Sequence, residues 1–276
     1  MAVPLILTAD TVTKLPSGSE GSVLVCGSHG GLYPGYLAAK AGLRAVVFND
    51  AGVGRAGAGI ASLAYLEAFG IAAAAVSHAS CRIGDSADML ARGVVSHANR
   101  LADAAGVVAG LSCAEAADRL GTYPLPNLRP DPSPVSEGRS AEPAYPGAIR
   151  RIVLIDSAAM VLPEDEGQIV VTGSHGGLVG GQPFMALRVS AYAAVFNDAG
   201  IGREGSGLTR LPALDARGIA AFTVSADSAE IGSARSSLED GTISAVNARA
   251  EQLGAQIGAS AKQVIARWSL PEAGAF

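Results

Sequence analysis

Two short motifs with polar side chains each occur twice in this chain. Gly-Ser-His-Gly-Gly stands at residues 27–31 and again at 173–177, and Phe-Asn-Asp-Ala-Gly stands at 48–52 and again at 196–200. Histidine titrates near neutral pH, and Ser, Asn and Asp can orient a substrate or another side chain. Both motifs are therefore candidates for parts of a catalytic site.

The histidines of the first motif are the strongest candidates, because His29 and His175 are the only histidines present in both copies. We expect them to act as general acids, general bases or ligands. The structural alternative is a ring that hydrogen-bonds to nearby backbone and fixes the turn. Ser28 and Ser174 precede them, but the motif is not the G-x-S-x-G nucleophile elbow. Either serine would need a base from the other copy, and a plain hydrogen-bonding role is equally consistent.

The glycines of the first motif predict an anion site. A glycine-rich turn from a strand into a helix brings backbone N–H groups close to a ligand, and the N-terminus of the helix favours negative charge. Gly30 and Gly176 are therefore expected to hold an anionic or carbonyl oxygen.

The second motif ends an apolar strand in each copy, where a carboxylate needs a partner or a function. Asp50 and Asp198 could orient a catalytic histidine or activate water, and they could equally cap turns. Asn49 and Asn197 could donate to a substrate carbonyl or brace the loop.

Arginines follow these motifs in glycine-rich loops. Arg55 and Arg203 suit bidentate binding of a carboxylate, and the alternative is a solvated loop residue. Arg82 could hold the substrate or pair with Glu230 across the boundary between the copies.

No cofactor is expected. Glycines at 52, 54 and 57 match G-x-G-x-x-G only loosely and lack the following βα unit, so a nucleotide-dependent enzyme is a minor alternative. A divalent metal such as zinc is a minority possibility, because the ligand types suit it although no local metal motif does. Its ligands would be His29, His175, Asp50 and Asp198.

The repeat predicts two tandem-duplicated α/β half-domains related by a pseudo-twofold axis, each with a mainly parallel sheet covered by helices. The first repeat covers residues 1–121, a proline-rich linker covers 122–148 and the second repeat covers 149–276. Parallel sheets bind ligands at the carboxyl ends of their strands, where both motifs fall.

Apolar runs and turn residues give the expected elements. Asp85 and Ser233 are expected to be helix N-caps. A helix is expected over 86–105, because its apolar residues follow a 3.6-residue period, with a close contact or a break at Gly93. The other expected elements are helices near 36–41 and 58–69, strands at 4–8, 22–26, 44–48 and 71–76, and strands at 152–155, 168–172, 193–196 and 219–224.

The composition excludes several classes of partner. A net charge of −5 and an aromatic content of 5% argue against nucleic acid. No apolar stretch reaches the roughly 18–20 residues of a membrane span, and the apolar run at 1–7 is interpreted as a first strand. Cys26, Cys81 and Cys113 lack disulfide or metal spacing, which indicates a reducing, cytoplasmic setting. Helices rich in Ala and Gly favour a homo-oligomer.

These residues predict a small-molecule enzyme with its site between the two copies. We expect hydrolysis of an amide or another carbonyl-containing substrate, which could be anionic. The alternatives are a lyase or isomerase step on a carboxylated substrate, or a non-catalytic protein that binds a small anion. If His29 and His175 are structural, the candidates become His78, Arg82 and His97.

Gly-Ser-His-Gly-Gly also resembles the glycine–histidine turn of creatininase-type amidohydrolases. The resemblance covers these five residues alone. The acidic and histidine ligands that flank the turn in that family have no counterparts here, so the sequence assigns no family.

Overall fold

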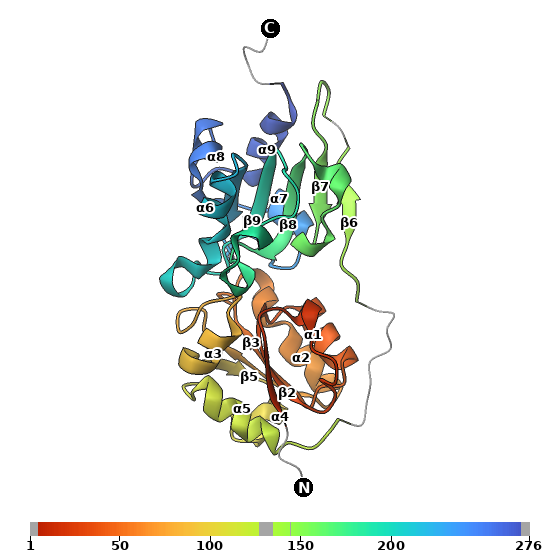
Figure 1. Cartoon of the computed structure of the whole chain (residues 1–276), viewed down its shortest axis with the longest axis vertical. Helices are drawn as coiled ribbons and strands as arrows, with labels where there is room; N and C mark the ends of the chain where they lie inside the picture. Colours follow the sequence, from red (N-terminus) through yellow and green to blue (C-terminus); the bar gives the residue numbers. More distant parts are fainter. Residues whose placement is uncertain (1–4, 127–134, 144, 272–276) are drawn as a thin grey trace.

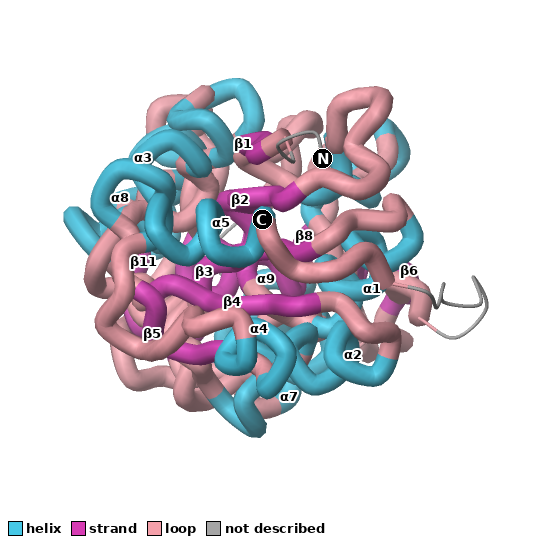
Figure 2. The backbone as a smooth tube through the Cα atoms, turned by 90° about the horizontal axis from the view of Figure 1, so that it is seen from below, coloured by secondary structure: helices cyan, strands magenta, loops and turns pink. Residues whose placement is uncertain are grey.

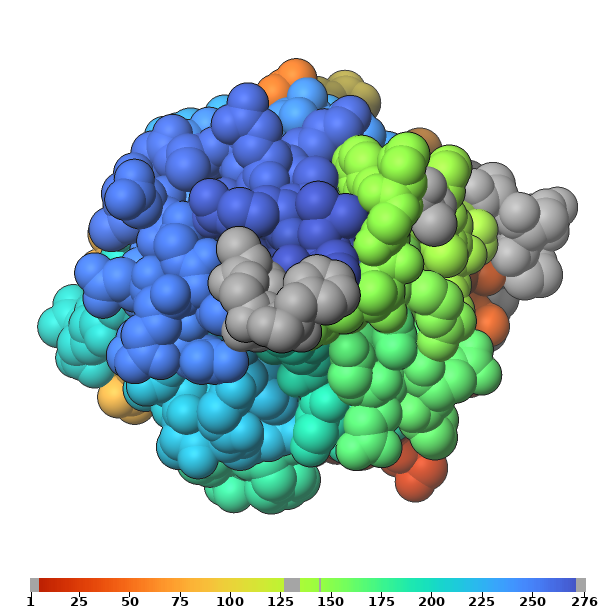
Figure 3. All heavy atoms as spheres, turned by 90° about the horizontal axis from the view of Figure 1, so that it is seen from above, coloured from red at the N-terminus to blue at the C-terminus, as the bar shows by residue number. Residues whose placement is uncertain are grey.

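The computed structural model describes residues 5–126, 135–143 and 145–271. The two halves of the chain form two lobes that are stacked along the long axis (Figure 1). Seen along that axis, one end of the molecule is made almost wholly of the second half, in green to blue (Figure 3). Each lobe has its own sheet and its own helices, so the predicted α/β fold with two half-domains is confirmed.

The sheet of the first half has five strands in the order β1-β2-β3-β4-β5 within the described residues. The first four strands are parallel and β5 is antiparallel to β4. The central strands are buried on both faces, which explains their continuous apolar sequences. The strands are β1 (Ile6–Ala9), β2 (Val23–His29), β3 (Ala45–Asn49), β4 (Ala72–Val76) and β5 (Val95–Ala98).

The sheet of the second half repeats this order and adds one strand at its edge. Strands β7 to β10 are parallel, and both β11 and the added β6 run antiparallel to their neighbours. The order is β11-β10-β9-β8-β7-β6. The strands are β6 (Arg139–Ala141), β7 (Ile152–Ile155), β8 (Ile169–His175), β9 (Ala193–Asn197), β10 (Ala220–Val224) and β11 (Ile243–Val246).

Helices cover both faces of each sheet (Figure 2). In the first half, α1 (Leu32–Lys40) and α2 (Ser62–Ala68) pack on one face. The opposite face is covered by α3 (Ser86–Arg92), α4 (Arg100–Ala104) and α5 (Cys113–Gly121). Cys26, Cys81 and Cys113 are buried and free, as expected of small core residues.

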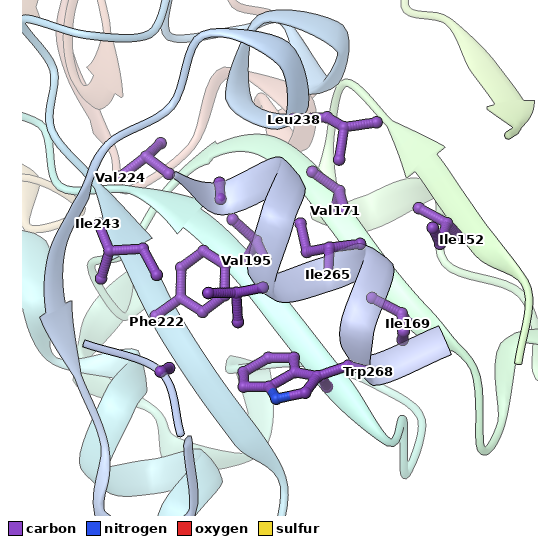
Figure 4. Close-up of a cluster of buried hydrophobic side chains, with 14 of the residues drawn as sticks. Ile152, Ile169, Val171, Val195, Phe222, Val224, Leu238, Ile243, Ile265 and Trp268 are labelled. Carbon is purple, nitrogen blue, oxygen red and sulfur yellow. The ribbon is translucent and has the colours of Figure 1, made fainter. Parts of the chain in front are cut away.

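In the second half, α6 (Arg210–Asp215) lies on one face, and the other is covered by α7 (Ala234–Glu239), α8 (Ala248–Gln252) and α9 (Ala261–Ser269). Trp268 of α9 packs on Phe222, with their ring centroids 5.5 Å apart (Figure 4). Two short 3-10 turns stand where the first half has α1. The 3-10 segments are Val12–Lys14, Arg55–Ile60, Ala158–Met160, Pro163–Asp165, Val179–Gly181, Pro183–Met185 and Arg203–Leu208.

The predicted helix over 86–105 is wrong. The chain forms α3, leaves the helix at Gly93, pairs as β5 with β4, and begins α4 after the cap Asn99. A Cβ at Gly93 would lie 2.4 Å from the carbonyl oxygen of Met89, so this close approach needs glycine. Met89, Val95 and Ala102 are buried in one cluster, whereas Ala87, Ala91 and Val94 of the same segment are exposed. The apolar spacing therefore did not mark one buried helix face, and it could not separate one helix from three short elements. Asp85 and Ser233 cap α3 and α7 as predicted.

The predicted proline-rich linker contains a strand. Within 122–148, β6 pairs antiparallel with β7 and so joins the sheet of the second half. Residues 127–134 and 144 of that segment, like residues 1–4 before β1, lie outside the described residues. The strand matters for the site, because it begins two residues after Glu137.

Candidate functional site

The carboxyl ends of β2 and β8 meet where the two lobes join (Figure 1). A cavity of about 100 Å³ lies there and is lined by residues of both halves. Gly27 to His29 and Gly173 to His175 continue their strands, so the turn of each motif begins at the glycine after the histidine. The cavity brings together four predicted site residues, namely Ser28, His29, Ser174 and His175.

The two histidine rings are held in the same way. Nδ1 of His29 accepts a hydrogen bond of 3.1 Å from the N–H of Gly31, and Nδ1 of His175 accepts one of 3.2 Å from Gly177. A ring nitrogen that accepts carries no proton, so each neutral ring has its proton on Nε2. Neither ring makes a second hydrogen bond to another residue in the described parts of the chain.

Each ring reaches into the other half. A Cβ at Gly232 would lie 3.6 Å from Cε1 of His29, and a Cβ at Gly84 would lie 3.5 Å from Cε1 of His175. The two histidines therefore belong to one composite pocket, and each is packed by the lobe that did not supply it.

Both imidazoles are neutral at physiological pH. Burial lowers the pKa of His29 to about 4. The pKa of His175 falls well below its usual value because of burial, with smaller contributions from the positive charge of Arg210 and from repulsion by His29 when that ring is protonated. Neutral rings with the proton on Nε2 act as hydrogen-bond donors, which suits a substrate carbonyl oxygen better than proton abstraction.

The serines line the cavity but brace the loops that follow β1 and β7. Oγ of Ser28 accepts from the N–H of Val12 at 3.1 Å, and Oγ of Ser174 accepts from the N–H of Ala158 at 2.9 Å. Neither hydroxyl is bonded to a histidine in the residues that the structure describes. This geometry favours the hydrogen-bonding interpretation over the nucleophile.

The expected anion cradle at Gly30 and Gly176 is wrong. The N–H of Gly30 donates to the carbonyl of Asn49 at 2.9 Å, and that of Gly176 donates to the carbonyl of Asn197 at 2.7 Å. Glycine is needed at Gly176 because a Cβ would lie 2.3 Å from the carbonyl oxygen of Gly207. The repeated glycines serve close backbone packing, so their N–H groups are not available to a ligand.

The Asn-Asp-Ala-Gly loops join the lobes and do not line this cavity. A Cβ at Gly52 would lie 2.9 Å from Cα of Gly200, so the two loops meet back to back. Asp50 accepts from the N–H of Gly52 and from His78, and Asp198 accepts from two N–H groups of its own half. Asn49 and Asn197 each accept from the N–H two residues later. These side chains therefore brace the interface, and the prediction that they share a pocket with the histidines is corrected.

The arginines predicted to bind substrate also hold the lobes together. Nη1 of Arg55 donates to the carbonyl of Ser228 at 2.9 Å, and Nη1 of Arg203 donates to that of Ser80 at 3.4 Å. Arg82 does pair across the boundary, but with Glu204 at 3.2 Å and not with Glu230. None of the three lines the cavity, because their charges are used in contacts between the halves.

The proposed metal ligands do not converge. The described residues contain no group of three or more His, Cys, Asp or Glu side chains placed to hold a metal ion. Of the four residues considered, only the two histidines line the cavity. Of the fallback candidates, His78 is bonded to Asp50, and His97 of β5 is bonded to Ser96, which donates to the same carboxylate.

A carboxyl group that the sequence did not suggest lines the cavity. Burial and the neighbouring charge of Asp156 raise the pKa of Glu137 to about 7, and a hydrogen bond from Ser157 opposes this rise. Asp156 is itself held by the N–H groups of Gly138 and Ala234. Glu137 has no counterpart in the repeat and lies among prolines, so no pattern marked it. Asp156 could have been found, since Asp10 follows β1 as Asp156 follows β7.

The segment that carries Glu137 is anchored by a buried ion pair. Arg139, the first residue of β6, donates from Nη1 to Oδ2 of Asp165 at 3.0 Å and from Nη2 to Oδ1 at 2.7 Å. The carboxylate of Asp165 is fully buried. This bidentate pair fixes the start of β6 and with it the position of Glu137, two residues earlier. The remaining charged or phenolic residues of the cavity wall are Lys14, Tyr33, Arg188 and Arg210.

No helix among the described residues has the length and apolar character needed to cross a membrane. Comparison of the chain with models of protein families, with curated proteins and with solved structures finds no significant match.

Proposed function

We propose that the protein is a small-molecule enzyme whose active site is the cavity between the lobes, and that it hydrolyses an amide C–N bond. The observation that carries this proposal is the placement of two neutral histidines and of Glu137, with a pKa of about 7, around one cavity. A group with a pKa near the working pH can both accept and release a proton efficiently.

The parts have complementary roles in this proposal. Nε2–H of His29 and of His175 donates to the carbonyl oxygen and stabilises the negative charge that develops on it. Ionised Glu137 takes a proton from water as the water oxygen bonds to the carbonyl carbon. Protonated Glu137 then gives this proton to the leaving nitrogen as the C–N bond breaks, so protons balance over the cycle.

The same groups could move a proton on a carbon next to a carbonyl, as in an isomerase or lyase. A binding protein for small anions would use the cations of the wall instead. Mass spectrometry separates these outcomes when the protein is incubated with a panel of linear and cyclic amides and of small oxo acids in D₂O. Hydrolysis adds the elements of water, isomerisation exchanges hydrogen for deuterium, a lyase splits the compound, and a binding protein leaves it unchanged.

The pH dependence tests the role of Glu137. Activity should rise with pH through about 7, because the base is ionised above its pKa. Glu137→Gln should abolish this activity, and His29→Gln and His175→Gln should each lower kcat by about 10²-fold, as expected for a lost oxyanion donor. Glu142→Gln is the matched control, because Glu142 lies on the same segment outside this cavity. Full activity of Glu137→Gln would exclude the mechanism. A cytoplasmic location and a homo-oligomeric state remain predictions.

A further inference from the structure

A buried arginine lines the same cavity. Among the described residues, Arg210 is the most deeply buried Lys or Arg, with 4% of its surface exposed. It is the first residue of α6, at the end of the cavity that His175 occupies. A buried cation is costly unless a negative group or hydrogen-bond acceptors compensate it.

Backbone carbonyl groups compensate part of the buried charge of Arg210. Nε of Arg210 donates to the carbonyl of Gly177 at 3.0 Å, and Nη1 donates to the carbonyls of Met185, at 3.0 Å, and Ala186. The guanidinium carbon also lies 5.0 Å from the centroid of the Phe196 ring. Within the described parts of the chain, Nη2 has no acceptor and no carboxylate forms an ion pair with this arginine.

The first half has a serine, Ser62, at the position that corresponds to Arg210. Ser62 and Arg210 occupy the same place, since their N–H groups donate to the carbonyls of Gly30 and Gly176 respectively. In the second half, short turns replace α1, and the arginine binds their carbonyl groups. Arg217 does the same from outside the cavity, where it binds the carbonyls of Leu187 and Val189. Bracing of this loop therefore does not by itself require a charge in the cavity wall.

The wall of the cavity carries charges of both signs. Arg210 is close enough to His175 to lower the pKa of that ring, and Asp156 is close enough to Glu137 to raise the pKa of that carboxyl. Exposed Lys14 and Arg188 add two more cations to the lining. The cavity wall thus carries cationic groups, acidic groups and the two histidines.

We propose that the cavity binds a small carboxylate, whose oxygens are held by Nη2 of Arg210 with Arg188 and Lys14 at the entrance. A hydrogen bond from a guanidinium N–H to a carboxylate is strengthened by both charges, and the low dielectric of the wall strengthens it further. This inference rests on the proposed function for the identity of the site: the carboxylate end of the substrate lies on Arg210, and its reacting carbonyl lies at the histidines.

Binding is tested without turnover, with propionate against its neutral isostere propionamide, at constant ionic strength set with chloride. Propionate should raise the melting temperature saturably with a Kd of about 1–10 mM, and propionamide should not. Arg210→Met should abolish the shift, and Arg188→Gln should weaken binding about threefold to tenfold, as for an exposed charge at a site entrance. Arg217→Met should lower the melting temperature but keep the propionate shift, because it removes only loop bracing.

A second measurement uses the unaltered chain, in case Arg210→Met does not fold. The side-chain N–H resonances of Arg210, assigned with Arg210→Lys, should shift on addition of propionate and not of propionamide. An equal response to both compounds, or no response of Arg210, would overturn the inference. Binding of propionate without turnover of any compound in the panel would overturn the proposed function and leave the carboxylate site in place. Turnover of neutral amides without propionate binding would overturn the carboxylate site and leave the proposed function in place.

Discussion

Nδ1 of His78 lies 2.8 Å from Oδ1 of Asp50, and a Cβ at Gly200 in the other half would lie 2.8 Å from Cδ2 of the same ring. This histidine thus links a buried carboxylate of the first half to the backbone of the second. The corresponding position of the second half holds Ala226, so the contact is not reciprocal.

The His78–Asp50 pair should make stability depend on pH. The hydrogen bond with Asp50 raises the pKa of His78 above its usual 6.5, against the effect of burial. The pKa of His78 is higher in the folded than in the unfolded protein. The pairing therefore stabilises the folded state fully below pH 6.5, and this stabilisation is lost as the pH rises through the folded pKa. His78→Ala should cost about 1–2 kcal/mol at pH 5.5 and less at pH 9, measured by urea unfolding. His97→Ala, which leaves this pair intact, should show no such trend.

Asp50 contributes in the opposite pH range. Although burial alone would raise it, hydrogen bonds from His78 and Ser96 lower the pKa of Asp50 below its usual 3.8. Its stabilisation is therefore present above pH 3.8 and is lost as the pH falls through the folded pKa. A stability profile of the unaltered protein should fall on the acid side for this reason, and Ser96→Ala should move that fall to higher pH.

His29 and His175 should resist protonation. The folded pKa of His29, about 4, lies below its usual 6.5, so stability is complete above pH 6.5 and is lost as the pH falls toward 4. Nitrogen-15 NMR should show both rings neutral, with the proton on Nε2, at pH 6. His29→Gln should remove about 3 kcal/mol of the loss in unfolding free energy between pH 6.5 and pH 4. A ring that titrates near pH 6.5 would contradict the neutral-donor assignment.

The contact between Gly52 and Gly200 can be tested with alanine. Both Gly52 and Gly57 have φ in the left-handed region, at 78° and 69°. A Cβ at Gly57 meets nothing within 4 Å, whereas at Gly52 it would lie 2.9 Å from Gly200. Gly57→Ala should therefore cost only the conformational strain, about 1–2 kcal/mol, and Gly52→Ala at least about 2 kcal/mol more. Equal losses in thermal or urea unfolding would show that the loops separate readily.

Arg139 is expected to position Glu137. Arg139→Leu leaves the buried carboxylate of Asp165 without its partner and should cost at least about 2 kcal/mol. It should also lower the pKa of Glu137 toward its usual 4.5, because the released segment exposes that carboxyl to water. Glu164→Gln removes only the ion pair between Nη2 of Arg139 and the exposed carboxylate of Glu164, whose atoms are 3.4 Å apart. This change should cost about 0.5 kcal/mol or less. Carbon-13 NMR titration of the Glu137 carboxyl checks the shift, which a purely structural pair would not produce.

The sequence by itself determined the fold class and the two central histidines. Central strands such as β3 and β9 are buried on both faces, so each appears in the sequence as a run of apolar residues that ends in an asparagine. The repeated motif marked His29 and His175, and capping chemistry marked Asp85 and Ser233, because these signals lie within a few neighbouring residues. Local periodicity failed at 86–105, where pairing with β4 outweighs helix formation.

Only the tertiary structure decided which polar residues share the cavity. Glu137 reaches it because a segment outside the repeat pairs with β7, and Arg210 reaches it because short turns replace a helix. Conversely, the repeated Asn-Asp-Ala-Gly loops meet at the interface, where their polar groups satisfy the backbone. Long-range packing sets these distances between groups far apart in the chain, and it leaves no short-range pattern in the sequence.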